Sequence, residues 1–427
     1  MKEENRRYKV EFLDMVQLMF GTFKYNDHQL HFVVDFDTHI NEKIFKTAMD
    51  LSARIMPIIK CQYVKAFTTP YWKRCDFSAE DLVTVIMTDR IEEEKPKYNV
   101  QKTNVEKGPQ IKATILRSKS CDSLCITMNH MLCDAAGFKQ YLYEMSDIYS
   151  HLEKDPTYMP PVLERSRSMS QIFKHISLWD KMKIFYSVIT KKEKEDDLSF
   201  SFEGDEDRPF IITHSLSQNR FLQIKEYVKQ EQATINDALF AAFTRAIQKK
   251  FHKNAITLPC PVDLRKYIPS KGNEGICNLV SFITCDISEI GSTYKETLDK
   301  VRKAMNKQKR ELTCLSLVMA GHLLYELFPY PIAKKIIMKS FGNPPLSLTN
   351  IGIIDHNKLQ FEGVNVASCY MTGSIKYKPY FQIGVTTFKQ CMTLTVNFHG
   401  TPNDEQEIKD FLQLMDEELP RTTFSKK

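Results

Sequence analysis

The sequence predicts a mixed α/β protein of two units, in which helices pack on sheets. Predicted strands and helices alternate along the chain, and their order is typical of a mixed sheet covered by helices. A length of 427 residues is sufficient for two domains of ordinary size. The content of 42% apolar and 26% charged residues allows a sizeable core and excludes a largely disordered chain.

The N-terminal half begins with a strand over residues 30–37, in which every second residue is apolar. Residues 41–55 have the apolar spacing of an amphipathic helix, which Pro57 ends. From Phe138 onwards apolar residues recur at helical spacing, so another helix is expected there. Further strands are predicted over residues 58–64, 83–87, 111–116 and 124–128.

The middle of the chain contains one amphipathic and one charged segment. Residues 170–190 have apolar side chains at helical spacing with lysines between them. This pattern fits a basic helix that meets a membrane surface. The interpretation that we favour is a connecting helix that packs on the body of the protein, with its lysines in solvent. Residues 191–208 are predicted to form an exposed linker because charge dominates them.

The C-terminal half starts near Phe210. Thr234 predicts a helix N-terminus, with Asp237 in the capping-box position. The remaining expected elements are strands over 256–262, 279–287, 347–354, 364–370, 381–388 and 392–398, and helices over 294–309, 315–328 and 405–414.

The stretch LCITMNHMLCDAAGF, residues 124–138, runs from an apolar strand into a helix. His130 and Asp134 therefore lie on a tight connection, where a side chain is held rigidly and can still reach a cavity. A neutral His in such a place can act as a general base near neutral pH. Taken alone, the His-x-x-x-Asp spacing fits a structural His and a helix-capping Asp better, because short motifs often match by chance.

Several segments in a fixed order change this balance. NHMLCDAAG at 129–137 resembles the HHxxxDG signature of the chloramphenicol acetyltransferase-like superfamily, which includes peptide-synthetase condensation domains and alcohol acetyltransferases. The other matching segments are PIIK at 57–60, TINDAL at 234–239, PVDLRKYIP at 261–269 and SLTNIG at 347–352. The resemblance implies a fold of two related α/β lobes with an active-site tunnel between them.

The resemblance and the composition together predict three regions. Residues 1–165 are the N-terminal lobe that carries the His-x-x-x-Asp motif, and residues 210–427 are the C-terminal lobe. Residues 166–209 hold the connecting helix and the charged linker.

The resemblance also assigns roles to individual residues. His130 would be the general base, and Asp134 would be structural, turned away from the cavity and paired with a basic side chain. Arg265 is the first choice of partner because its guanidinium matches a carboxylate in a planar, bidentate way. Lys60 is the second choice, and an exposed loop position remains an equal alternative for Arg265.

The tetrahedral intermediate of an acyl transfer needs donors for its oxyanion. Ser347, Thr349 and Asn350 are polar residues in an otherwise apolar strand, and their segment resembles one that borders the tunnel in the family. Asn350 is the candidate that we carry forward. The alternative is a strand-end turn in which these side chains satisfy the local backbone.

The motif departs from the family at two positions. Asn129 stands where the signature has its first His, and Ala135 stands where it has Gly. Ala135 bears on the width of the cavity beside His130, since Gly allows a closer approach. Asn129 makes an alcohol or amine acyltransferase more probable than a peptide-forming condensation domain.

A metal site is not expected. Cys121, Cys125, His130 and Cys133 have ligand-like residue types, but two cysteines four apart on an extended strand are separated by roughly 13 Å. Zinc ligands with bonds of ~2.3 Å cannot span that distance without a turn.

The sequence therefore predicts an acyltransferase that moves an acyl group from an acyl-coenzyme A or acyl-carrier-protein thioester to a small alcohol or amine. The alternatives are a stand-alone amide-forming condensation enzyme and a non-catalytic binding relative. No permanent cofactor, nucleic acid or membrane contact is expected, and the protein is predicted to be a monomer. The absence of a signal pattern and the scattered, unpaired set of eleven cysteines predict a cytoplasmic location.

Overall fold

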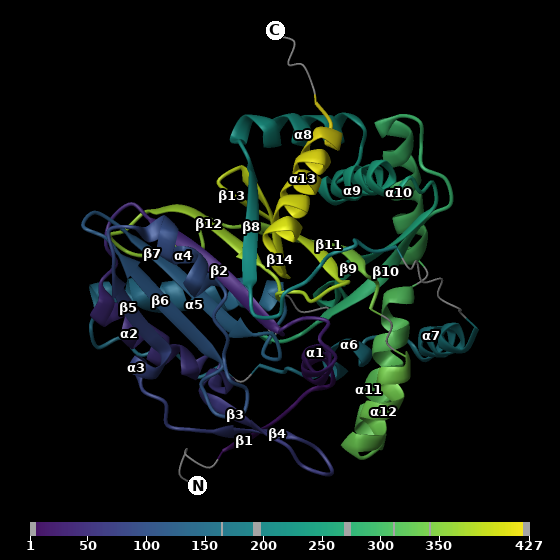
Figure 1. The fold of residues 1–427 in the computed structure, drawn as a ribbon. Helices are drawn as coiled ribbons and strands as arrows, with labels where there is room; N and C mark the ends of the chain where they lie inside the picture. Colours follow the sequence, from purple (N-terminus) through teal and green to yellow (C-terminus); the bar gives the residue numbers. More distant parts are fainter. Residues whose placement is uncertain are drawn as a thin grey trace.

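The computed structural model describes residues 6–163, 165–190, 198–268, 275–310, 312–340 and 343–421. Its strands form two large sheets, one in each lobe, and helices pack against both (Figure 1). The mixed α/β fold expected from the sequence is confirmed. In the described part of the chain, no helix combines the length and the apolar character needed to cross a membrane.

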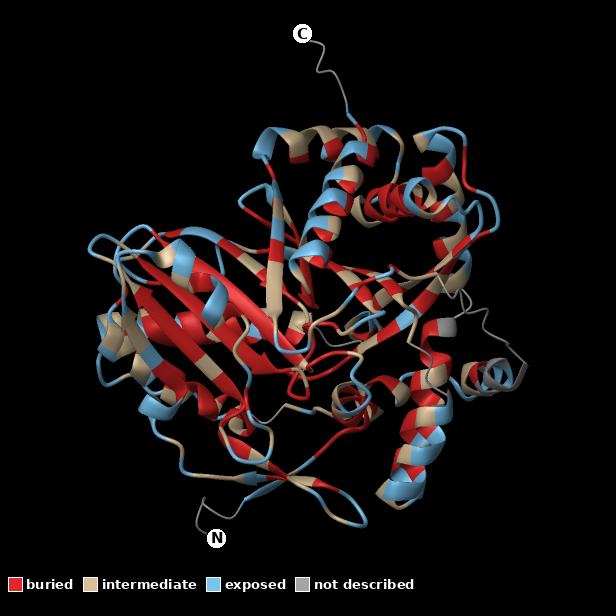
Figure 2. Ribbon diagram, in the orientation of Figure 1, coloured by how far each residue is buried: buried red, intermediate tan, exposed pale blue. Residues whose placement is uncertain are grey.

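The N-terminal lobe is built on a five-stranded sheet in the order β12-β2-β7-β6-β5. Its strands are β2 (Gln29–Phe36), β5 (Val83–Met87), β6 (Ile111–Arg117), β7 (Asp122–Asn129) and β12 (Val366–Thr372). Strand β7 is central, and all 8 of its residues are buried. Figure 2 shows the buried strands of this sheet in red. The end of β7 is therefore a rigid, interior point from which a side chain can be positioned.

Helices and a small second sheet complete this lobe. The helices are α1 (Phe12–Thr22), α2 (Glu42–Leu51), α3 (Ala79–Leu82), α4 (Ile91–Asn99) and α5 (Ala135–Lys154), and the small sheet joins β1 (Arg7–Lys9), β4 (Tyr71–Arg74) and β3 (Cys61–Val64). The strand expected over 58–64 is wrong in its first half. Pro57–Lys60 forms a 3-10 helix, because Pro at its first position presets a helical φ angle.

The C-terminal lobe has a four-stranded sheet in the order β11-β13-β14-β8 and a separate β9-β10 hairpin. These strands are β8 (Pro209–Leu216), β9 (Ile256–Asp263), β10 (Val280–Ile287), β11 (Leu346–Ile354), β13 (Phe381–Phe388) and β14 (Cys391–His399). The helices around them are α8 (Gln218–Gln230), α9 (Ile235–Phe251), α10 (Tyr294–Arg310) and α13 (Pro402–Glu418). Helix α9 begins with the expected capping box between Thr234 and Asp237.

One strand crosses between the lobes. β12 follows β11 in the sequence, yet it pairs with β2 at the edge of the N-terminal sheet. The boundaries 1–165, 166–209 and 210–427 stay a prediction, and β12 shows that lobe membership does not follow the chain order throughout.

The connecting region differs from its prediction. The helix expected over 170–190 is two helices, α6 (Ser170–Phe173) and α7 (Leu178–Thr190). Residues 191–197 of the expected linker lie outside the described residues. The rest is not uniformly exposed, because Phe200 and Phe202 are buried and stack on each other with ring centroids 4.8 Å apart. Helix α11 (Ser316–Leu327) packs against both α7 and α12 (Tyr330–Ser340), at the lower right of Figure 1.

Candidate active site

His130 lies on the turn that directly follows β7. Its backbone N–H donates to the carbonyl oxygen of His28 at 2.8 Å. The turn is built by Asn129, whose Oδ1 accepts from the Met131 N–H at 3.0 Å and whose Nδ2 donates to Gln110 Oε1 at 2.8 Å. Asn129 is fully buried. The residue that departs from the family signature therefore fixes the backbone that presents His130.

The imidazole of His130 is held in its neutral form. Burial lowers the pKa of His130 below its usual value, more than the charge of Asp134 raises it. Its Nδ1 atom is buried and has no hydrogen-bond partner among the described residues. A neutral imidazole has one nitrogen with a free lone pair, so at neutral pH this side chain can accept a proton.

Asp134 anchors the other end of the turn as the N-cap of α5. Its Oδ1 accepts from the Gly137 N–H at 2.9 Å, and its Oδ2 accepts from the Leu279 N–H at 2.7 Å. Arg265 Nη1 also donates to Oδ2, at 3.0 Å, while Arg265 Nη2 donates to the Cys277 carbonyl at 2.7 Å. The Asp134 carboxylate thus binds the C-terminal lobe through the backbone N–H of Leu279 and the guanidinium of Arg265.

The pair named as first choice from the sequence is therefore in contact. Burial acts to raise the pKa of Asp134, but the charge and hydrogen bond of Arg265 and the two backbone amides hold it below its usual value. Lys60, the second choice, pairs instead with Asp50. A Cβ on Gly137 would lie 2.7 Å from Cys133 Cβ and 3.3 Å from Arg265 Nη2, so this approach requires a glycine.

A second buried ion pair holds the same turn. Asp14, on α1, accepts from Arg167 Nη1 at 3.0 Å and from Asn278 Nδ2 at 3.1 Å. Arg167 Nη2 donates to the carbonyl of Leu132 at 2.7 Å, and Asn278 Nδ2 donates to the carbonyl of His130 at 2.9 Å. These three residues connect α1, the connecting region and the C-terminal lobe to the backbone of the turn.

None of these three residues was predicted from the sequence. Helix α1 was not expected, although its capping box at Glu11 and Asp14 was a visible signal. Asp14 also interrupts an apolar run, which marks a polar side chain that needs a buried partner.

Two further basic side chains lie near His130. His28 has a left-handed backbone with φ 46°, and burial, followed by the charge of His130, lowers its pKa to about 4. Lys376 lies on the connection between β12 and β13, where burial lowers its pKa to about 8. The charge of Lys376 acts in turn to lower the pKa of His130. Neither residue stood out in the sequence, because each is brought to His130 by pairing between distant segments.

Asn350 is engaged locally. Its Oδ1 accepts from the Gly352 N–H at 3.0 Å, at an irregularity of β11 where Gly352 has φ 84°. Ser347 Oγ donates to the Phe381 carbonyl at 3.4 Å. Lys139, in the first turns of α5, donates to the Ile351 carbonyl at 2.7 Å, so this part of β11 lies beside the helix that Asp134 caps.

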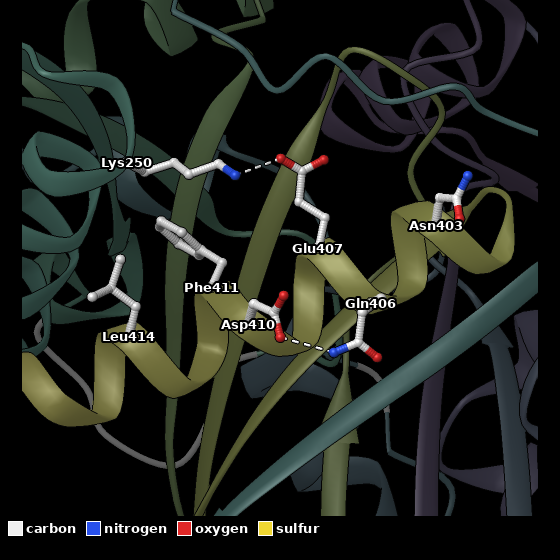
Figure 3. Close-up of a pocket in the computed structure, with 7 residues that line it drawn as sticks. All are labelled: Lys250, Asn403, Gln406, Glu407, Asp410, Phe411 and Leu414. Carbon is white, nitrogen blue, oxygen red and sulfur yellow. Dashed lines mark hydrogen bonds and ion pairs between the residues drawn. The ribbon is translucent and has the colours of Figure 1, made fainter.

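In the described part of the chain, the cysteines form no metal site beside His130, and a surface cavity lies away from it. Cys125 lies within β7, and no cluster of His, Cys, Asp or Glu in the described part of the chain is arranged to hold a metal ion. A cavity of about 430 Å³ lies on the C-terminal lobe. Figure 3 shows its lining along α13, where Lys250 pairs with Glu407 at 2.7 Å beside Phe411. It includes no residue of the motif segments.

Comparisons with known proteins support the fold. Residues 276–421 match the family described as WS/DGAT C-terminal domain, a range that contains Asn278 and Asn350. A search of curated proteins gives no match. Among solved structures, the first condensation domain of the calcium-dependent antibiotic synthetase, in complex with a substrate analogue, is similar with a TM-score of 0.72 at 10% identity. The similarity covers 100% of this protein and 99% of the condensation domain.

Two other solved structures are similar over nearly their whole length. A trichothecene 15-O-acetyltransferase from Fusarium sporotrichioides has a TM-score of 0.68 at 13% identity and covers 97% of this chain and 96% of that chain. The starter condensation domain of rhizomide synthetase, in complex with C8-CoA and Leu-SNAC, has a TM-score of 0.66 at 11% identity. The similarity covers 96% of this protein and 94% of that domain. The two-lobe fold that the resemblance to the chloramphenicol acetyltransferase-like superfamily implied is thus confirmed, while the tunnel stays a prediction.

Proposed function

We propose that this protein transfers an acyl group from a thioester to a hydroxyl or amine, with His130 as the general base. The observation that carries the proposal is a neutral imidazole, with its Nδ1 atom buried, on a turn that is held by two buried ion pairs. The similar acetyltransferase and condensation-domain structures support the reaction class, and the complex with C8-CoA supports a thioester donor. Acyl-coenzyme A and an acyl carrier protein are both candidates for that donor, and no permanent cofactor is needed.

In the proposed reaction, the neutral His130 takes the proton from the acceptor as its oxygen or nitrogen attacks the thioester carbon. The resulting tetrahedral oxyanion needs a donor, and the Nδ2 group of Asn350 is the candidate because its Oδ1 is already used. The carbon–sulfur bond then breaks, and the proton held by His130 passes to the leaving thiolate. Asp134 and Arg265 position the turn and take no part in the proton transfer.

The decisive experiment incubates the protein with a panel of acyl-coenzyme A donors and alcohol or amine acceptors and follows free thiol. His130→Ala should lose roughly 10²–10⁴-fold of the thiol release, as expected for a general base. His356→Ala is the matched control, because His356 is exposed. Equal release by parent and His130→Ala would remove His130 from the proposed role.

Two outcomes lead to the alternatives. Thiol release with amine acceptors alone would favour a stand-alone condensation enzyme, a reading supported by the condensation domains among the similar structures. If no thioester were consumed, from coenzyme A or from a carrier protein, the non-catalytic binding relative would replace the enzyme proposal.

A further inference from the structure

Three helices on one side of the molecule expose apolar side chains that the sequence pattern assigns to a core. More than half of the large apolar side chains that are exposed in the described part of the chain lie on or directly beside α7, α11 and α12, and α11 contacts both of the other helices. They are Leu178, Trp179, Met182, Tyr186, Leu323, Leu327, Phe328, Ile332 and Ile336, and we call this set the basic apolar face. Figure 2 shows exposed segments along these helices at its lower right.

The exposure is systematic along each helix. On α7, Leu178 and Met182 are one turn apart and are 76% and 58% exposed, whereas Ile184, on another side of the helix, is 3% exposed. On α12, Ile332 is 49% exposed while the adjacent Ala333 is fully buried. Each helix therefore has one apolar side packed on the protein and a second apolar stripe that faces outward.

Lysines flank these stripes. Lys335 and Lys339 are exposed and lie one turn apart on α12 beside Ile332. Among the residues that the structure describes, the lysines in or next to α7 and α12 are Lys174, Lys181, Lys183, Lys334, Lys335 and Lys339. Within the three helices as described, carboxylates are fewer and have partners: Asp180 lies 3.6 Å from Lys183, and Glu326 lies 2.5 Å from Lys9. The face is therefore apolar and net positive.

We propose that the basic apolar face binds an anionic lipid membrane surface. An outward stripe with Trp, Leu and Met, bordered by Lys, is the pattern of helices that lie in the membrane interface. Charge complementarity favours this occupant over a second copy of the chain, because dimerisation through the face would bring two sets of lysines together. The proposal goes beyond acyl transfer and reverses the expectation that the membrane plays no part.

A flotation assay with vesicles of phosphatidylcholine alone, or mixed with phosphatidylserine, tests the proposal without reference to activity. The parent protein should float with the mixed vesicles, not with phosphatidylcholine alone, and the binding should weaken as salt rises. Trp179→Ser combined with Met182→Ser should weaken binding at least about tenfold, since it removes two interfacial apolar groups. Met87→Ser is the matched control, because Met87 is 72% exposed on β5, outside the face.

A second pair of variants tests how much the charge of the lysines contributes to membrane binding. Lys335→Glu combined with Lys339→Glu should weaken binding about 25-fold or more, since each lysine near an anionic surface contributes roughly fivefold. Lys225→Glu combined with Lys229→Glu makes the same change one turn apart on α8 and should leave binding unchanged. All these side chains are exposed, so melting temperatures should match that of the parent.

Three results would overturn the proposal. The first is a parent protein that does not float with phosphatidylserine vesicles. The second is equal weakening by the α8 lysine variant and the α12 lysine variant. The third is a concentration-dependent dimer in size-exclusion chromatography that the Trp179 and Met182 variant abolishes, which would assign the face to a second copy.

Discussion

Two buried ion pairs of the same composition hold the turn that carries His130, yet the pKa values of their carboxyl groups shift in opposite directions. Asp134 meets Arg265 at 3.0 Å, and Asp14 meets Arg167 at 3.0 Å. In the first pair the pKa of the carboxyl is lowered, because Arg265 and backbone amides outweigh burial. In the second pair burial raises the pKa of Asp14 by more than Arg167 and Asn278 lower it.

The difference comes from the backbone around each carboxylate. Asp134, the N-cap of α5, accepts from two backbone N–H groups, those of Gly137 and Leu279, which favour its charged form. Asp14 has one backbone donor, the Glu11 N–H at 3.1 Å, and the carboxylate of Glu11 lies close enough to repel it. A buried Arg–Asp contact alone therefore does not decide whether the acid is stabilised in its charged form.

The largest effect is expected for Asp134→Asn. Removing this carboxylate leaves Arg265 buried without its partner, which should cost roughly 3–5 kcal/mol in the free energy of unfolding. Denaturant unfolding measures that loss, and thiol release should fall with it because the turn loosens. If activity fell while the free energy of unfolding stayed at the parent value, Asp134 would instead be a catalytic acid.

A double-mutant cycle sharpens this assignment. Arg265→Met should reproduce much of the loss, and the double variant should lose less than the two single losses added together, since contacting residues are not additive. Independent behaviour of the two substitutions would rule out the energetic pairing of Asp134 with Arg265.

A smaller effect is expected for Asp14→Asn. The amide can still accept hydrogen bonds, and the substitution removes the cost of burying a charge, so the loss should be about 1–3 kcal/mol. Denaturant unfolding again provides the measurement, with Asp50→Asn as a control because Asp50 is paired with Lys60 but partly exposed. A loss as large as that of Asp134→Asn would erase the contrast between the two pairs.

The smallest effect is expected in how the losses in the free energy of unfolding of Asp134→Asn and Asp14→Asn depend on pH. Between about pH 7 and about pH 4.5, Asp134 is ionised in both the folded and the unfolded chain, because its folded pKa lies below the usual value, so its loss should stay constant. The folded pKa of Asp14 is raised, so the parent gains stability as the pH falls through that window and the Asp14→Asn deficit should grow. Glu11, with its pKa raised by burial to about 7, acts in the same direction. Parallel pH curves for the two variants would contradict the difference.

The sequence could predict the pair that belongs to a motif. Asp134 and Arg265 lie 131 residues apart, and the resemblance to a known signature related them. Asp14, Arg167 and Asn278 belong to no such signature, and their convergence depends on how α1, the connecting region and β10 pack. Most strands and helices were visible as apolar periodicity, whereas the 3-10 helix at Pro57–Lys60 and the break before α7 depend on local backbone geometry that periodicity does not report.

The central claim is that a neutral His130, on the turn that the two ion pairs hold, accepts the proton in acyl transfer. The most direct test is the rate of thiol release as a function of pH, at low concentrations of thioester and acceptor. Because burial lowers the pKa of His130 below 6.5, the rate should be level above about pH 6.5 and should fall in acid as the imidazole is protonated. A rate that keeps rising well above neutral pH, or an unchanged profile in His130→Ala, would contradict the account.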